Sequence, residues 1–108
     1  MMYHIDLNSD VGEGVGNEAQ LIPLLSSCNI ACGGHAGDDA IIQKTIQLAI
    51  NNNVKIGAHP GYPDKENFGR TIVDMSVTAL RESLKEQILT VKNFAERQHQ
   101  KLHHVKVH

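Results

Sequence analysis

Residues 29–38, with the sequence NIACGGHAGD, constrain the fold more than any other part of the chain. The stretch reads as a short apolar strand, a glycine turn, a histidine, and an acidic residue that opens a helix. Residues 5–14 and 56–61 repeat this layout, since each is an apolar strand followed by carboxylates or a histidine among glycines. Three strands that end in this way indicate an α/β protein whose reactive side chains gather at one edge of a sheet.

The hydrophobic periodicity predicts strands and helices in strict alternation, which is typical of a parallel sheet with a βαβαβαβ order. We expect one domain, residues 1–108, since its length is near the common domain size. The residues that we expect to cap the helices at their amino ends are Asn17, Asp38 and Ser76. The predicted strands are residues 3–8, 28–32, 54–58 and 103–108. The predicted helices are residues 18–27, residues 39–52, and a third helix that follows Ser76 and includes residues 80–95. Pro23 must lie in the first turns of the first helix, or that helix starts later.

The composition excludes several classes of protein. A net charge of −2 gives no basic footprint for nucleic acid. The apolar runs are shorter than the roughly 20 residues that span a bilayer, so no membrane partner is expected. The first residues lack the pattern of a signal peptide, which predicts a cytoplasmic protein. The spacing of Cys28 and Cys32 does not suit a disulfide or a zinc knuckle, so both are predicted to be reduced core thiols.

Four residues at the predicted strand ends are candidates for catalysis: Asp10, Glu13, His35 and His59. Carboxylates and imidazoles that face one cleft suit proton transfer and water activation. Two histidines with an aspartate can also hold a divalent metal, and the sequence leaves open whether a metal is bound. Each residue alone also has a structural interpretation, such as a turn aspartate or a hydrogen-bonded histidine. Their joint position at corresponding strand ends favours the functional interpretation.

Further residues near these strand ends are candidates for binding a substrate. Glycines beside a histidine let a ligand reach backbone N–H groups, and an arginine on the long loop of residues 62–74 can clamp a carboxylate or phosphate. The sequence contains no Gly-x-x-x-x-Gly-Lys-Ser/Thr loop, which excludes that type of nucleotide site. The candidate binding residues are Asp6, Asn8, Gly33, Gly34, Asp38 and Arg70.

Three motifs resemble the lactam-utilisation (LamB/YcsF) family: DLNSDVGEG at residues 6–14, CNIACGGHAGD at residues 28–38, and GAHPGYPD at residues 57–64, which is followed by FGR at residues 68–70. The resemblance implies a 5-oxoprolinase that opens the lactam of 5-oxoproline to L-glutamate, with ATP (and Mg²⁺) as co-substrate and subunits B and C as partners. In this hypothesis Asp10 and Glu13 handle protons or water. His35 and His59 orient or protonate the reacting centre.

The resemblance also implies a (β/α) barrel of the glycoside hydrolase and deacetylase type. Such barrels typically need about 250 residues, so we expect the N-terminal half of a barrel. His108 then stands where the family has a histidine after the fourth strand. A half barrel exposes two sheet edges, which predicts an oligomer or association with a separate C-terminal half.

Two other functions stay open at this point. One is a metal-dependent, deacetylase-like hydrolase built on Asp6, Asp10, His35 and His59. The other is a non-catalytic remnant that binds a small carboxylate or a partner protein.

Overall fold

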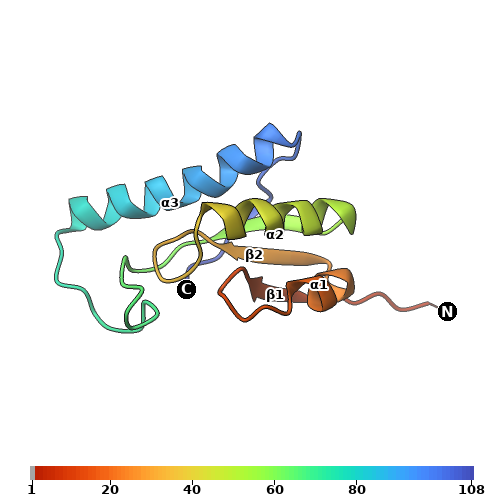
Figure 1. Cartoon of the computed structure of the whole chain (residues 1–108), viewed down its shortest axis with the longest axis horizontal. Helices are drawn as coiled ribbons and strands as arrows, with labels where there is room; N and C mark the ends of the chain where they lie inside the picture. The colour runs from red at the N-terminus through yellow and green to blue at the C-terminus, as the bar shows by residue number, and fades with distance from the viewer. Residues whose placement is uncertain (1) are drawn as a thin grey trace.

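The computed structural model describes residues 2–108, so Met1 of the predicted domain lies outside the described range. Strands and helices alternate along the chain (Figure 1). All strand pairs are parallel, and their order in the sheet follows the chain, which confirms the predicted βαβαβαβ arrangement. The strands are β1 (Asn8–Val11), β2 (Ser27–Ala31), β3 (Lys55–His59) and β4 (His104–Val105). The helices are α1 (Glu18–Leu21), the short 3₁₀ helix η1 (Ile22–Leu24), α2 (Asp39–Asn51) and α3 (Val77–Arg97).

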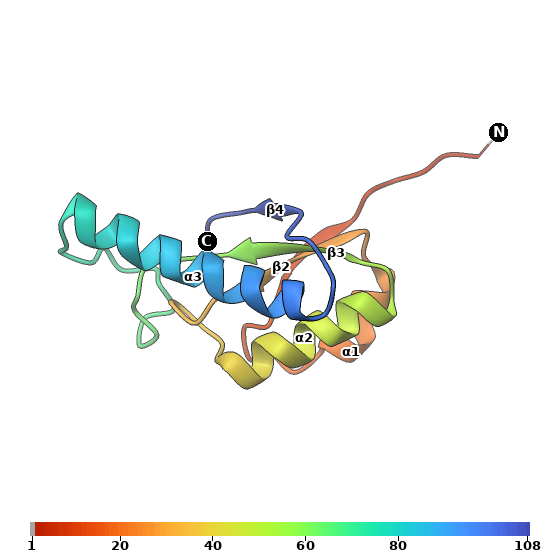
Figure 2. The same ribbon diagram turned by 90° about the horizontal axis from the view of Figure 1, so that it is seen from above.

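The apolar core lies between one face of the sheet and the helices, which Figure 2 shows on the same side of the strands. Ile30 of β2 and Ile56 of β3 belong to this core with Ile42 and Ile46 of α2 and Val91 of α3. Each of these side chains has at most 3% of its surface exposed. Full burial of one large aliphatic side chain contributes about 1.5–3 kcal/mol. This packing fixes the helices on the sheet and leaves the opposite face for polar residues.

The opposite face of the sheet carries polar side chains. The register pairs Asp10 with Asn29, Asn29 with Gly57, and Gly57 with His104, so these four residues form one row across the sheet. Asn29 is fully buried despite its polarity. Strand β2 is therefore covered on both faces, as its nearly uniform apolar sequence predicts.

The two longer helices begin at the predicted caps. The side chain of Asp38 accepts a hydrogen bond from the N–H of Ile41 at 2.9 Å, and that of Ser76 accepts one from Ala79 at 3.1 Å. Asn17 does precede α1, but its side chain makes no capping bond, because its backbone angles (φ −109°, ψ 12°) depart from the extended conformation of a cap. None of the helices in the described part of the chain is long and apolar enough to cross a membrane.

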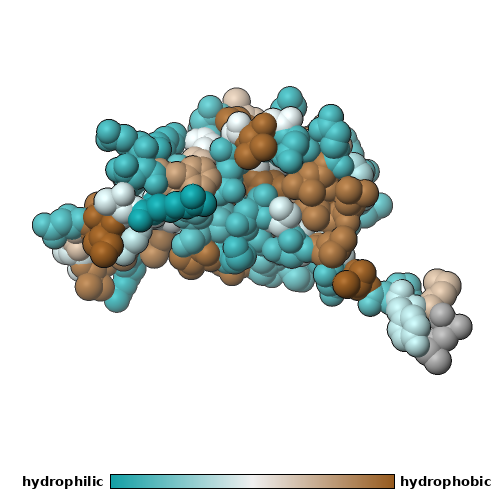
Figure 3. All heavy atoms as spheres, turned by 90° about the horizontal axis from the view of Figure 1, so that it is seen from below, coloured by the Kyte–Doolittle hydropathy of each residue, from teal (hydrophilic) through white to brown (hydrophobic). Residues whose placement is uncertain are grey.

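The prediction of a first strand at residues 3–8 is wrong in its bounds. Strand β2 begins at Ser27, which lies opposite Asn8, so the ladder between the two strands starts only there. Upstream, Tyr3 and Ile5 are 87% and 79% exposed. Figure 3 shows the N-terminal end extending away from the body of the molecule. The partner strand, rather than the local apolar pattern, therefore sets where β1 begins.

The first predicted helix, residues 18–27, is also wrong beyond Leu21. The chain tightens into η1, which contains Pro23 in its first turn, and Leu25 is already extended with a ψ of 152°. Proline lacks the N–H that would continue an α-helix, so the helix ends early. As a result β2 starts at Ser27, one residue before its predicted first residue.

The predicted fourth strand forms a ladder over two residues only. The backbone nevertheless continues beside β3, because the N–H groups of Lys106 and His108 donate to the carbonyls of Ala58 and Pro60, each at 2.9 Å. The segment that follows β4 therefore stays next to the carboxyl end of β3. This position brings His108 to the same edge of the sheet as the other strand ends.

Cys28 and Cys32 are free thiols, and both are buried. Burial raises the pKa of each thiol to about 12, because an apolar environment disfavours the charged thiolate. Since the thiolate is the reactive form, neither side chain is suited to redox or nucleophilic chemistry. The prediction of core thiols is confirmed.

We expect both cysteines to resist thiol reagents while the chain is folded. At pH 8 a thiol with a pKa of about 12 is thiolate in roughly one part in ten thousand. Titration with a chromogenic disulfide should show almost no reaction in buffer and two thiols per chain in denaturant. Rapid reaction of one thiol under native conditions would contradict the buried position.

Candidate active site

The carboxyl ends of the strands meet at one edge of the sheet, because all strands are parallel. Asp10 lies near the end of β1, Glu13 follows in the glycine turn, and His59 is the last residue of β3. His35 follows β2, and His108 follows β4. Potential ligand atoms of Glu13, His35, His59 and His108 all lie within 4.8 Å of one another. We call these four side chains the histidine cluster.

Glu13 is the centre of the histidine cluster. Its Oε2 lies 2.6 Å from Nε2 of His35, 3.7 Å from Nε2 of His59 and 4.0 Å from Nδ1 of His108. The side chain is only 14% exposed. An ionised carboxylate only accepts hydrogen bonds, so His35 donates its Nε2–H to Glu13. One carboxylate oxygen therefore faces three imidazoles in a largely dry environment.

The orientation of His59 is fixed by the backbone of the segment after β4. Its Nδ1 donates to the carbonyl oxygen of Lys106 at 2.7 Å, since a carbonyl can only accept. Its Nε2 is buried without a hydrogen-bond partner and lies 3.4 Å from Oδ2 of Asp10. Both Asp10 and Glu13 thus face this nitrogen, which makes it the natural point of proton exchange in the site.

His35 is enclosed by other rings. It stacks on His108 with ring centroids 3.9 Å apart and an angle of 2°, and it meets Phe68 edge-on at 5.1 Å. Burial lowers the pKa of His35, and this effect outweighs the opposing effect of the hydrogen bond that His35 donates to Glu13. The neutral ring with its proton on Nε2 is therefore the favoured form, and it holds Glu13 in place.

Two glycines make room for the His35 ring. A Cβ atom on Gly61 would lie 2.8 Å from Nδ1 of His35, and one on Gly69 would lie 2.6 Å from its Cβ. Gly69 also has a φ of +67°, a conformation that favours glycine. The ring can occupy its position because both of these residues are glycines, which have no side chain.

Asp10 is held by a network on the polar face. Its Oδ1 accepts from Nδ2 of Asn29 at 2.9 Å, and its two oxygens accept from Nζ of Lys106 at 3.0 and 3.2 Å. Burial alone would raise the pKa of Asp10, but these hydrogen bonds and the charges of His59 and Lys106 lower it overall. Asp10 is therefore an ionised carboxylate beside His59.

His104 reaches across the sheet to the same network. Its ring passes over Gly57 of β3, and its Nε2 contacts Oδ1 of Asn29 on β2 at 2.6 Å. A Cβ atom on Gly57 would collide with the His104 ring. This contact links β4 to β2 across the strand between them.

Nearly the whole chain matches one family model. The description of that model is the LamB/YcsF family, and the match covers residues 5–108. The chain belongs to the LamB/YcsF family.

Curated relatives of this LamB/YcsF chain include two proteins named as the A subunit of 5-oxoprolinase. The one from Bacillus cytotoxicus is 44% identical over 112 residues, which cover 99% of this chain and 44% of the relative. One from Staphylococcus epidermidis is 42% identical over 113 residues, which cover 100% of this chain and 45% of the relative. The chain therefore spans less than half the length of these relatives.

A solved structure has the same fold. The lactam utilization protein from Thermus thermophilus superposes with a TM-score of 0.92 at 37% sequence identity. The similar region covers 98% of this chain and 45% of that protein. The four-stranded unit therefore corresponds to part of the longer Thermus thermophilus protein.

The structure brings the four predicted catalytic residues of this LamB/YcsF chain to one place. Asp10, Glu13, His35 and His59 lie within ion-pair distance of at least one other member of the group. This agrees with the expectation that parallel strand ends meet at one edge. Their catalytic roles stay predictions.

Three predicted binding residues have structural contacts in this fold. Gly33 has a φ of +91° and donates its N–H to the carbonyl of Ala36 at 2.9 Å, which closes the turn after β2. A Cβ on Gly34 would collide with the side chain of Gln87 on α3. Asp38 uses one carboxylate oxygen for its helix cap. These contacts explain the residue types without a substrate.

The other three predicted binding residues lie at different places relative to the histidine cluster. The side chain of Asn8 bonds to Asn29, so it supports the network beneath Asp10. Asp6 is exposed and lies two residues before β1, at the opposite end of that strand from the histidine cluster. Arg70 is exposed and lies over the Phe68 ring, with its Cζ 5.1 Å from the ring centroid. The structure does not bring Asp6 to the cluster.

Sequence reasoning missed several residues of the site. His104 and Lys106 line the polar side together with His108, at every second residue, so the alternation along the predicted fourth strand was a usable signal. Gln87 carries no such signal, yet its amide bonds both the N–H and the carbonyl of Gly61, at 3.0 and 2.9 Å. Phe68 stood out only as part of the FGR motif, and its place in an irregular loop gave no sign that its ring and carbonyl contact the histidines.

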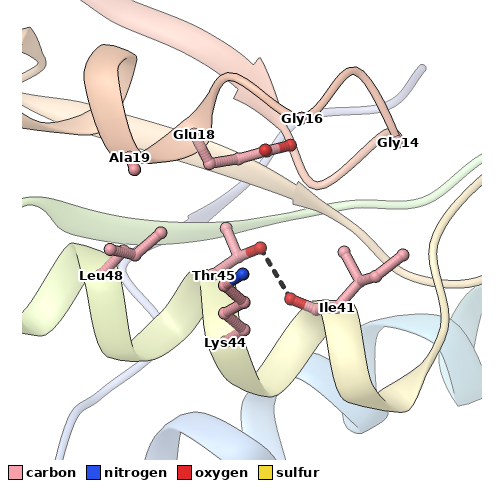
Figure 4. Close-up of a pocket in the computed structure, with 8 residues that line it drawn as sticks. All are labelled: Gly14, Gly16, Glu18, Ala19, Ile41, Lys44, Thr45 and Leu48. Carbon is pink, nitrogen blue, oxygen red and sulfur yellow. Dashed lines mark hydrogen bonds between the residues drawn. The ribbon is translucent and has the colours of Figure 1, made fainter.

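A hollow of about 310 Å³ lies away from the histidine cluster, between α1, the glycine turn and α2 (Figure 4). Two of its polar side chains are engaged within the fold. The hydroxyl of Thr45 donates to the carbonyl of Ile41 at 2.7 Å, and Glu18 accepts from the N–H of Gly12 at 3.2 Å. The hollow contains none of the predicted catalytic residues, so we do not place the chemistry there.

We expect Gly57→Ala to destabilise the chain through its collision with His104. Displacing that ring from Asn29 should cost about 1–3 kcal/mol of unfolding free energy. In a His104→Ala background the same change should be neutral or stabilising, because alanine is favoured over glycine inside a strand. Denaturant titration of the four proteins in this cycle measures the coupling. An equal cost of Gly57→Ala in both backgrounds would contradict the contact.

Proposed function

We propose that this chain is the N-terminal portion of the A subunit of a 5-oxoprolinase, which takes part in the ATP-dependent opening of 5-oxoproline to L-glutamate. The observation that carries this proposal is the identity of 42–44% to proteins of that name over essentially the whole chain. The histidine cluster with Asp10 supports it independently, because lactam opening requires both water activation and proton transfer.

The chemistry explains why ATP is needed. A five-membered lactam is a stable amide with a poor electrophilic carbon. Transfer of the γ-phosphoryl group of ATP to the lactam oxygen gives ADP and an activated ring carbon. Water then adds to this carbon, the ring nitrogen takes up a proton, and the C–N bond breaks to leave the free amine and an acyl phosphate. A second water hydrolyses the acyl phosphate, which releases phosphate and the carboxylate of glutamate. ATP, with Mg²⁺, is thus a co-substrate in this proposal.

The geometry suggests how the roles are divided. Nε2 of His59 lies between Asp10 and Glu13, at 3.4 and 3.7 Å, so it can pass a proton between a water molecule and either carboxylate. His35 keeps Glu13 oriented through the 2.6 Å hydrogen bond. We assign water activation to Asp10 and Glu13 and proton delivery to His59.

A deacetylase-like enzyme is less well supported. Its predicted ligand set included Asp6, which lies at the other end of β1 from the histidine cluster. That set is therefore not assembled by this fold.

In this proposal the other half of the barrel supplies the rest of the site. The four strands would form one half of a (β/α) barrel, in keeping with the 45% of the Thermus thermophilus protein that the chain covers. Val105 and Val107 are 45% and 63% exposed, and a covering helix from the remaining half would bury them. The ATP site and the rest of the cleft would come from that half and from subunits B and C, in the cytoplasm.

Reconstitution tests this function. The chain, produced together with the C-terminal part of a relative and subunits B and C, should form glutamate from 5-oxoproline and hydrolyse ATP in step. No 5-oxoproline-dependent glutamate formation with all components present would refute the proposal.

His59→Ala should lower the rate in this assay by about 100- to 10,000-fold, because general acid–base catalysis contributes an effect of that size. His4→Ala is the matched control, since His4 is exposed and lies upstream of β1. The control should keep the full rate. Equal rates for both variants would remove His59 from the mechanism.

A further inference from the structure

We propose that Glu13, His59 and His108 bind one divalent transition-metal ion, with His35 as the residue that positions Glu13. The juxtaposition of these side chains within 4.8 Å motivates the proposal. Two imidazoles and one carboxylate are a donor set that suits Zn²⁺ and its neighbours, and three protein ligands leave a fourth position open. The inference does not depend on the proposed lactam chemistry.

The hydrogen bonds of two histidines set the tautomers that a metal requires. His59 donates its Nδ1–H to the carbonyl of Lys106 at 2.7 Å, and His108 donates its Nε2–H to the carbonyl of Phe68 at 2.8 Å. In the neutral rings the lone pairs are then on Nε2 of His59 and Nδ1 of His108. Both lone pairs belong to the nitrogens that lie near Glu13. Metal-binding histidines are typically oriented by such a bond from the second ring nitrogen.

The buried nitrogen of His59 lacks a partner. The side chain is fully buried, and its Nε2 makes no hydrogen bond. It faces Oδ2 of Asp10 at 3.4 Å and Oε2 of Glu13 at 3.7 Å. A lone pair opposite two carboxylate oxygens is unfavourable, whereas a cation between them is stabilised by all three groups. The cation is either a proton on His59 or a bound metal ion, and the metal also satisfies His108.

The spacing is close to that of a metal site. Bonds of about 2.1 Å in a tetrahedral site place ligand atoms about 3.4 Å apart. Glu13 Oε2 lies 3.7 Å from the His59 nitrogen and 4.0 Å from the His108 nitrogen. Both distances to Glu13 Oε2 exceed the tetrahedral value by about 0.3 to 0.6 Å, so the ligands would move together when the ion binds. Water in the open position would have a lowered pKa, and Asp10, whose Oδ2 lies 3.4 Å from Nε2 of His59, is a further base beside the site.

His35 has a different part in this arrangement. Its Nε2 is engaged with Glu13 at 2.6 Å, and its ring stacks flat on His108 at 3.9 Å. It therefore orients one ligand by a hydrogen bond and another by packing. Loss of such a supporting group typically weakens metal binding by about 10- to 100-fold without removing a ligand.

Metal titration of the purified full chain tests the proposal, without 5-oxoproline, ATP or partner subunits. After removal of metal with a chelator, calorimetry with Zn²⁺ should show one ion per chain. Co²⁺ should give the intense visible absorption of a tetrahedral site. His59→Ala and His108→Ala should each weaken binding by at least roughly 100-fold, because each removes a ligand. His35→Gln should keep the stoichiometry and the Co²⁺ spectrum at about 10-fold lower affinity.

The C-terminal region contains other histidines, so the double variant His99→Ala/His103→Ala is the matched control. It should bind Zn²⁺ as the wild-type chain does. If that control loses binding while His59→Ala retains it, the site is elsewhere and the proposal is wrong.

A second measurement does not depend on variants that fold poorly. In ¹⁵N spectra of the wild-type histidines, Zn²⁺ should shift Nε2 of His59 and Nδ1 of His108. Their other ring nitrogens should stay protonated. Absence of stoichiometric binding, or a spectrum in which His59 is simply an imidazolium with and without Zn²⁺, would overturn the proposal. Neither result would bear on lactam opening, which the reconstitution assay measures separately.

Discussion

The rest of the site depends on the hydrogen bonds of the buried Asn29 side chain. Its Nδ2 donates to Asn8 and Asp10, and its Oδ1 accepts from Asn8 and His104. These bonds join β1, β2 and β4 on the polar face of the sheet. Because an unpaired buried polar group costs about 1–3 kcal/mol, the network is stable only when it is complete. Asp10 is thereby fixed beside His59 before any substrate arrives.

Glycine at three positions is the second requirement of this site. Gly57 lets the His104 ring cross β3, and Gly61 and Gly69 leave the space that His35 fills. The imidazoles are thus held by packing and by hydrogen bonds, which is the rigidity that a catalytic or metal-binding constellation needs. The proposed lactam opening uses Nε2 of His59 to pass a proton, whereas the proposed metal site uses the same nitrogen as a ligand. The two roles therefore belong to the metal-free and the metal-bound form of the site, and each form activates a water.

Much of the fold was predictable because its causes are local. The order of strands and helices follows from hydrophobic periodicity, and Asp38 and Ser76 mark helix starts through bonds to residues only three positions away. The bounds of β1 were not predictable, because they depend on where β2 begins, at Ser27. The early end of α1 was not predictable either, because it depends on how the chain around Pro23 turns to enter the sheet.

For the site, the sequence by itself determined which residues meet. Parallel strands carry their carboxyl ends to one edge, so Asp10, Glu13, His35 and His59 had to be neighbours. Only the tertiary structure decided which nitrogen of each ring is free. The carbonyl that orients His59 lies 47 residues away, and the one that orients His108 lies 40 residues away. Such contacts leave no local pattern, because they arise only when separate strands are packed side by side.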